Sequence, residues 1–110
     1  MPIFISRGNY TREALAGMIA KPEDRTEQVS KLVAAAGGKL HNLYMTFGEY
    51  DFLLIAEAPS EQDVLAALIA AGGTGGVTNL NTTFAVSAAD MKNAFAKAGS
   101  IAGKFRAAGA

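Results

Sequence analysis

The sequence contains no cysteine, and this absence removes two classes of site. Neither a disulfide nor a metal centre with thiolate ligands can form from the residues of this chain. A chain without disulfides is suited to a reducing compartment, so we predict a cytoplasmic location. The sequence also holds a single histidine, His41. Without a second histidine or a cysteine to join it, we expect no metal site.

An excess of charge of either sign is also absent. Lysine and arginine total 10 residues, aspartate and glutamate total 10, and the formal net charge is zero. Proteins that bind nucleic acids usually carry a basic excess, because the neutralisation of phosphates drives their affinity. We therefore expect no nucleic-acid partner and no attraction to an anionic membrane surface.

Long apolar runs are missing as well. No stretch approaches the roughly 20 apolar residues that a helix needs to cross a bilayer. The residues from Met1 to Phe4 lack the basic and apolar segments of a signal peptide. The glycines at 72–76 follow a helical pattern and precede a strand pattern, which is the reverse of a phosphate-binding loop. The sequence therefore predicts no membrane span and no cofactor.

What remains is the composition of a globular domain. Half of the 110 residues are apolar or aromatic and 18% are charged, which is typical of one folded domain. Runs rich in β-forming residues predict four strands. These runs are residues 2–8, 39–47, 52–58 and 77–86.

Helix signals separate these runs. Thr11, Ser60 and Ser87 are each placed to cap the N-terminus of a helix. Pro22 is expected to end the first helix and to begin a second helical segment. The glycine pair at 37–38 should stop that second segment.

The order β-α-β-β-α-β-α predicts an α+β fold of the ferredoxin-like βαββαβ type. Such a chain forms a four-stranded antiparallel sheet with helices on one face, here with an extra C-terminal helix. We place the domain at residues 1–98. Residues 99–110 are expected to form a tail that is loosely ordered or packed on a partner.

The third strand carries a signal beyond the fold. Residues 52–56 read Phe-Leu-Leu-Ile-Ala, whereas a strand with one solvated face alternates apolar and polar residues. Both faces of this strand are therefore apolar, and the face away from the helices needs a cover. The final helix, a second subunit or a ligand could provide this cover. We expect a second subunit, in a homodimer or higher homo-oligomer in which two sheets pack face to face.

The segment from Gly48 to Pro59, which reads GEYDFLLIAEAP, resembles the signature of the GYD domain family. Residues 8–11, 37–40 and 82–84 agree with the same family, so that the resemblance covers residues 2–97. It implies a dimeric α/β barrel built from two ferredoxin-like subunits. That superfamily includes monooxygenases, cyclases, isomerases and haem enzymes, but the family itself supplies no settled activity. The residues after 98 match nothing in it.

His41 is the first candidate site residue. On the second strand it is expected to share a face with Leu43, Met45 and Phe47. Inside a barrel it could act as a general acid or base, or as a haem ligand, since histidine titrates near neutral pH. An ordinary strand histidine at the surface is the alternative interpretation.

Tyr50 and Asp51, in the connection between the second and third strands, are the other candidates. Asp51 could be a base in a pocket and Tyr50 a hydrogen-bond donor. The alternative is turn chemistry, in which Asp51 accepts bonds from local amides and Gly48 supplies an unusual backbone angle.

Three functions stay open on the sequence. The first is a binding module for a small apolar ligand, with Arg7, Leu43, Met45 and Phe47 as ligand contacts. The second is a cofactor-independent oxygenase, cyclase or isomerase that uses His41, Tyr50 or Asp51 for proton transfer. The third is a purely structural or assembly role. The sequence does not decide whether the chain is an enzyme.

Overall fold

Four strands form one antiparallel sheet in the computed structural model, which describes residues 1–110. They are β1 (Ile3–Tyr10), β2 (Lys39–Met45), β3 (Phe52–Glu57) and β4 (Val77–Ala85). Their spatial order is β2-β3-β1-β4, and every neighbouring pair is antiparallel. This is the strand order of a ferredoxin-like sheet, and it confirms the predicted fold class.

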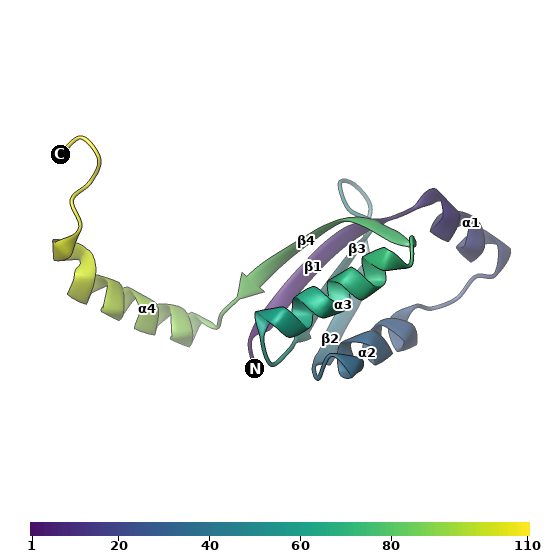
Figure 1. Cartoon of the computed structure of the whole chain (residues 1–110), viewed down its shortest axis with the longest axis horizontal. Helices are drawn as coiled ribbons and strands as arrows, with labels where there is room; N and C mark the ends of the chain where they lie inside the picture. Colours follow the sequence, from purple (N-terminus) through teal and green to yellow (C-terminus); the bar gives the residue numbers. More distant parts are fainter.

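Four α-helices and one short 3₁₀ turn complete the chain. They are α1 (Arg12–Ala20), α2 (Thr26–Ala35), α3 (Glu61–Gly73), α4 (Ala88–Ile101) and η1 (Ala102–Lys104). Helices α2 and α3 lie along one face of the sheet, whereas α4 extends away from it (Figure 1). No helix is both long enough and apolar enough to cross a membrane.

The three predicted helix caps are confirmed. In each case the hydroxyl accepts a hydrogen bond from the backbone N–H three residues further on. The bonds are Ala14 to Thr11 at 3.2 Å, Asp63 to Ser60 at 3.3 Å and Asp90 to Ser87 at 3.0 Å.

The start of the second helix differs from the prediction, because α2 begins at Thr26 and not at Pro22. The Asp24 carboxylate accepts hydrogen bonds from the hydroxyl of Thr26 at 2.6 Å and from its backbone N–H at 2.9 Å. These two bonds lower the pKa of Asp24. They close a local turn that competes with a helical conformation just before α2.

The two faces of the sheet have different environments. On the side of the helices, Phe4, Ser6, Phe52 and Ala56 are buried, and the Phe4 ring lies 5.7 Å from the ring of Phe84. The alternate residues of β1 and β3 face the other way. On this open face, strand register pairs Ile5 with Ile55 and Arg7 with Leu53, while Tyr44 of β2 pairs with Leu53. Both faces of β3 are therefore apolar, as its sequence predicts.

Candidate functional site

A cavity of about 730 Å³ lies between the sheet and helices α1, α2 and α3. Of the 29 residues that line it, 20 are hydrophobic, so the cavity suits an apolar ligand better than a polar one. Small-molecule sites have this size and this predominantly apolar lining. The main apolar contributions are Phe4, Phe52 and Leu54 from the sheet, Val29, Leu32 and Val33 from α2, and Val64, Ala67, Leu68 and Ala71 from α3.

The residues of α3 explain why space remains between the helix and the sheet. Ala67 and Ala71 point into the cavity, whereas Leu65 and Ile69 are exposed on the opposite side of the helix. The sheet contributes Ser6 and Ala56 across from them, which are also small. Because small side chains face one another there, the layer between helix and sheet is not filled.

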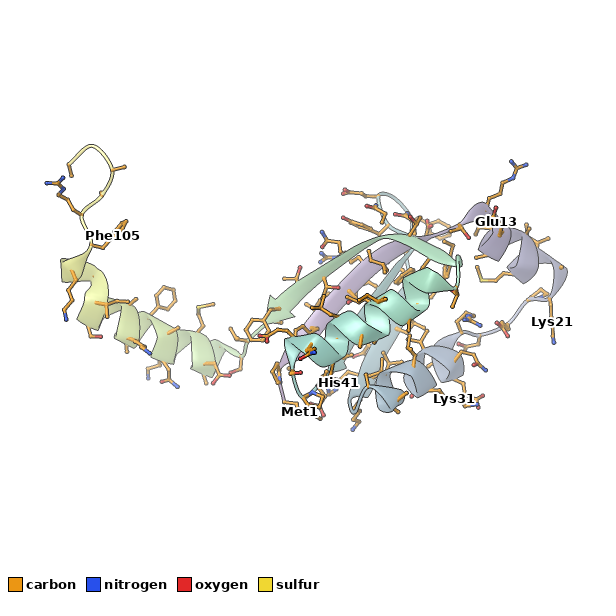
Figure 2. The ribbon with its side chains drawn as sticks, in the orientation of Figure 1. Met1, Glu13, Lys21, Lys31, His41 and Phe105 are labelled. Atoms are coloured by element: carbon orange, nitrogen blue, oxygen red, sulfur yellow. The ribbon has the colours of Figure 1, made fainter.

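Polar groups gather on the part of the cavity lined by β1 and by the connection between α1 and α2. Tyr10, Lys21, Glu23 and Arg25 all line it there. Glu23 and Arg25 form a salt bridge of 2.6 Å, while Lys21 makes no salt bridge. Figure 2 shows Lys21 and His41 far apart along the long axis of the domain. The cavity therefore combines an apolar body with a polar end, at which Lys21 is exposed to solvent.

Tyr10 lines the cavity and contacts residues of β2 and β3. Its ring lies 5.3 Å from the ring of Phe52, and its hydroxyl donates to the Met45 sulfur at 3.5 Å. Burial raises the pKa of the Tyr10 phenol; the charge of Arg25 opposes this rise, and the Asp51 carboxylate adds to it. The phenol therefore stays protonated at neutral pH, and a ligand that accepts its hydrogen bond would replace the Met45 sulfur as its partner.

The Gly48–Asp51 segment is tied to the end of β1 by hydrogen bonds. The Asp51 carboxylate accepts from the backbone N–H of Tyr10 at 2.9 Å, and the Asp51 N–H donates to the Gly8 carbonyl at 2.8 Å. The Asn9 side chain donates to the Glu49 carbonyl at 3.1 Å. The carboxylate of Asp51 is thus already used as a backbone acceptor, but for the N–H of Tyr10 on β1, 41 residues away in the sequence, and not for an amide of its own turn.

Tyr50 takes part in the same segment through its backbone. Its carbonyl accepts a hydrogen bond of 2.6 Å from the Thr46 hydroxyl. The Asp51 carbonyl accepts from the Thr46 backbone N–H at 2.8 Å, so Thr46 closes the hairpin from the β2 side. The phenol of Tyr50 makes no hydrogen bond in the structure.

His41 lies at a bulge, where the register of β2 and β3 shifts between Leu40 and Asn42. Its Nε2 atom lies 3.4 Å from the carboxylate of Glu57.

His41 and Asp51 do not form one catalytic group. Glu57, the partner of His41, is six residues beyond Asp51 in the sequence, about 20 Å at ~3.3 Å per residue along the extended β3 segment. The structure therefore brings Asp51 to Tyr10 and His41 to Glu57, at opposite ends of the hairpin. No group of three or more potential ligand residues is placed to hold a metal ion.

The four predicted ligand contacts are spread over several surfaces. Leu43 lines the cavity, and Met45 lies beside it against the Tyr10 hydroxyl. Arg7 is on the open face opposite Leu53, and Phe47 is fully exposed in the hairpin connection. Only Leu43 of these four residues belongs to the cavity lining.

Sequence reasoning did not identify Tyr10 or the inward faces of α2 and α3 as parts of a site. Their apolar spacing was visible, but such spacing is also that of an ordinary filled core. The useful signal was the run of alanines in α3, including Ala67 and Ala71, which is too small to fill the space over a sheet.

The fold is shared with a solved structure of low sequence identity. The crystal structure of MtbAldR aligns with a TM-score of 0.53 at 15% identity, covering 78% of this chain and 52% of that chain. This chain therefore spans about half the length of MtbAldR. A hypothetical protein, PHS023, from Pyrococcus horikoshii aligns with a TM-score of 0.45 at 18% identity, covering 79% and 92% of the two chains.

Sequence comparison leads to a family and not to an individual protein. No curated protein matches the chain. The model of the GYD domain matches residues 4–95, a range that runs from the second residue of β1 into α4 and includes the hairpin of Gly48–Asp51. The match extends over most of the chain and includes the residues that lock the hairpin onto β1. The chain therefore belongs to the GYD domain family.

Proposed function

We propose that the chain is a binding module for a small, mostly apolar molecule that occupies the cavity between the sheet and helices α1 to α3. The observation that carries this proposal is the cavity of about 730 Å³ with 20 hydrophobic residues in its lining. Protein cores are normally packed to the density of organic crystals. A space of this volume with an apolar lining is most simply a place for a ligand.

The polar groups of the cavity indicate how the ligand is oriented. Lys21 and the Tyr10 hydroxyl supply a positive charge and a hydrogen-bond donor beside the apolar lining. A ligand with one polar or anionic end places that end against these two groups, and its apolar part against α2 and α3. Such a small number of polar contacts is typical of sites that fix a ligand's orientation.

The enzyme alternative receives less support from the geometry. It relied on His41, Tyr50 or Asp51, and these residues belong to separate surfaces. Asp51 already accepts a backbone hydrogen bond, and His41 is not among the residues that line the cavity. General acid–base chemistry needs the acting group within reach of the substrate. Binding is therefore the function that we propose.

A matched pair of alanine substitutions tests the cavity. Ala67 lines it, whereas Ala66, its neighbour on α3, is exposed and does not. Ala67→Trp fills the space and should abolish the fluorescence gain of the dye anilinonaphthalene sulfonate, while Ala66→Trp should leave that gain unchanged. Each variant carries the only tryptophan of its chain, so its emission also reports the surroundings of the introduced indole.

Native mass spectrometry of protein purified from cells without added ligand extends this test. A reproducible extra mass that Ala67→Trp loses and Ala66→Trp retains would support the proposal. Equal dye binding by the two variants, or an extra mass that survives in both, would contradict it.

We also propose a homodimer in which the open faces of two sheets pack together. Ile5, Leu53 and Ile55 form the apolar centre of this face. Ile55→Lys places a charge in the contact, so we expect weaker self-association by light scattering at micromolar concentration, with an unchanged circular dichroism spectrum. A monomeric wild-type chain at the same concentration would contradict the dimer.

Two further predictions stay with this proposal. The cytoplasmic location is supported by the cysteine-free composition. The division between a domain at residues 1–98 and a tail at 99–110 is supported by the end of the family match at residue 95. Fractionation of cells, and limited proteolysis with mass spectrometry of the products, would test these two points.

A further inference from the structure

Residues 88–110, which comprise α4 and the segment after it, form an arm that projects from the sheet. Figure 1 shows α4 continuing from the end of β4 and running away from the sheet. Figure 2 places Phe105 at the far end of the arm from the labelled residues of the domain. The molecule is consequently elongated, with extents of 60 × 32 × 22 Å. Every residue from Val86 to Ala110 is exposed.

The arm has an apolar side that nothing in its own chain covers. Met91 and Phe95 are four residues apart on α4, which places them on one side of the helix, and they are 45% and 70% exposed. Ala94 and Ala98 flank them. A free helix of 14 residues is only marginally stable in water, and most helices gain their stability by packing an apolar face. The structure of α4 therefore requires a partner surface.

Charge indicates what that partner is. The arm holds four basic residues, Lys92, Lys97, Lys104 and Arg106, against the single acid Asp90, so its net charge is +3. Because the whole chain is neutral, residues 1–87 carry a net charge of −3. The arm and the domain are thus oppositely charged, and complementary potentials favour association between them.

The outer side of α3 is the matching surface. Leu65 and Ile69 are also four residues apart, and they are 57% and 73% exposed. The first turn of the same helix holds Glu61 and Asp63, and α3 contains no basic residue. It therefore offers an apolar pair of the same spacing as that of α4, together with the opposite charge.

The junction with β4 sends the arm away from its own α3. Only Val86 and Ser87 separate β4 from α4. Ser87 has an extended backbone, with φ −68° and ψ 160°, and its hydroxyl caps α4. The helix consequently continues beyond the end of the strand, as Figure 1 shows. Because the arm runs in this direction, it does not reach α3 of its own chain. A second copy of the chain can supply that α3 surface.

We propose that residues 88–110 of one copy dock on α3 of a second copy, with Met91 and Phe95 against Leu65 and Ile69. The positive side chains of the arm then lie near the acidic first turn of α3. This contact is independent of the cavity and of the open sheet face, because it uses the outer surface of α3.

The absence of cysteine permits a direct test. Leu65→Cys and Phe95→Cys are prepared as separate full-length proteins, one of them with an isotopic label, then mixed and oxidised. We expect a mixed disulfide between the labelled and unlabelled chains. Asn93→Cys lies on the other side of α4 and serves as the matched control, which should give little cross-linking with Leu65→Cys.

Two outcomes would overturn the proposal. One is the absence of the mixed disulfide, or its formation to the same extent with Asn93→Cys. The other is an intramolecular disulfide in a monomer of the double variant, which would show that the arm folds back on its own chain. Light scattering supplies a second readout: Lys92→Glu with Lys97→Glu should weaken self-association about tenfold, and an unchanged association constant would contradict the charge argument.

Discussion

The domain and the arm are built from similar local signals, yet they differ in what surrounds them. Helices α3 and α4 each begin with a serine cap followed by an acidic first turn. Strands β1 to β4 and helix α3 gain contacts across the sheet and the cavity, whereas α4 gains none of these. The comparison teaches that local signals determine where a helix forms, while only contacts between distant residues determine where its apolar face goes.

The sharpest test of this difference compares two glycines. A Cβ atom at Gly38 would collide with the backbone carbonyl oxygen of Glu57, whereas Gly99 of α4 has open space around it. We expect Gly38→Ala to lower the free energy of unfolding by about 3 kcal/mol, because the backbone must move. Gly99→Ala should leave the unfolding of the domain unchanged and raise the helicity of α4.

Chemical denaturation and circular dichroism measure both effects. If Gly38→Ala were as stable as the wild type, the close approach of Gly38 to β3 would not be essential. A loss of stability in Gly99→Ala would show that the arm is packed more tightly than its exposure indicates.

A second pair of glycines tests backbone conformation. Gly48 has φ +123° and Gly109 has φ +82°, values that side-chain-bearing residues rarely adopt. Gly48 lies in the hairpin that is bonded to β1, so Gly48→Val should cost about 1–2 kcal/mol. Gly109 is near the end of the chain and can relax, so Gly109→Val should have no effect on the melting temperature. Equal effects in the two variants would remove the distinction between them.

Two aspartates extend the comparison to hydrogen bonding. The Asp51 side chain accepts the Tyr10 backbone N–H at 2.9 Å, and Asp51→Ala should cost about 1 kcal/mol because that donor loses its partner. Asp90→Ala, in the first turn of α4, should change the stability of the domain far less. Urea unfolding of both variants provides the measurement, and an Asp51→Ala variant with wild-type stability would argue against the locking role of the hairpin.

The smallest expected effect concerns alkaline pH. Burial raises the pKa of Tyr10 above its ordinary value of 10.0 in the folded chain. The folded state therefore holds this proton more tightly than the unfolded state, and the resulting stability is present below pH 10 and is lost as pH rises through the folded pKa. Tyr10→Phe should lose less stability than the wild type between neutral and strongly alkaline pH. Identical pH profiles of the two melting temperatures would contradict this.

Much of the fold was predictable because its signals are local. Thr11, Ser60 and Ser87 cap helices as expected, since a cap depends only on residues within one turn. The all-apolar third strand correctly indicated a sheet with two apolar faces. The predicted start of the second helix at Pro22 was wrong, because helix spacing alone does not show that Thr26 donates hydrogen bonds to the Asp24 carboxylate.

The site was less predictable because it depends on register and on the spacing of layers. The register of β2 and β3 shifts at His41, between Leu40 and Asn42, and simple alternation along β2 could not reveal this bulge. The cavity exists because small side chains of α3 and of the sheet face one another. To predict it, one must know which residues of the sheet lie opposite which residues of α3. Residue types identified the hairpin motif, but only the structure joined Asp51 to the N–H of Tyr10.

The position of β4 at the edge of the sheet has a consequence for the behaviour of the protein in concentrated or heated solution. Soluble proteins usually guard such edges with charges, prolines or bulges. The irregular residue of β4, Asn79, lies near its start, and residues 80–85 contain neither a charge nor a proline. Their outward amides and carbonyls form a template for strands of other copies. Residues 80–85 are therefore the segment from which we expect amyloid-like aggregation of this chain to grow.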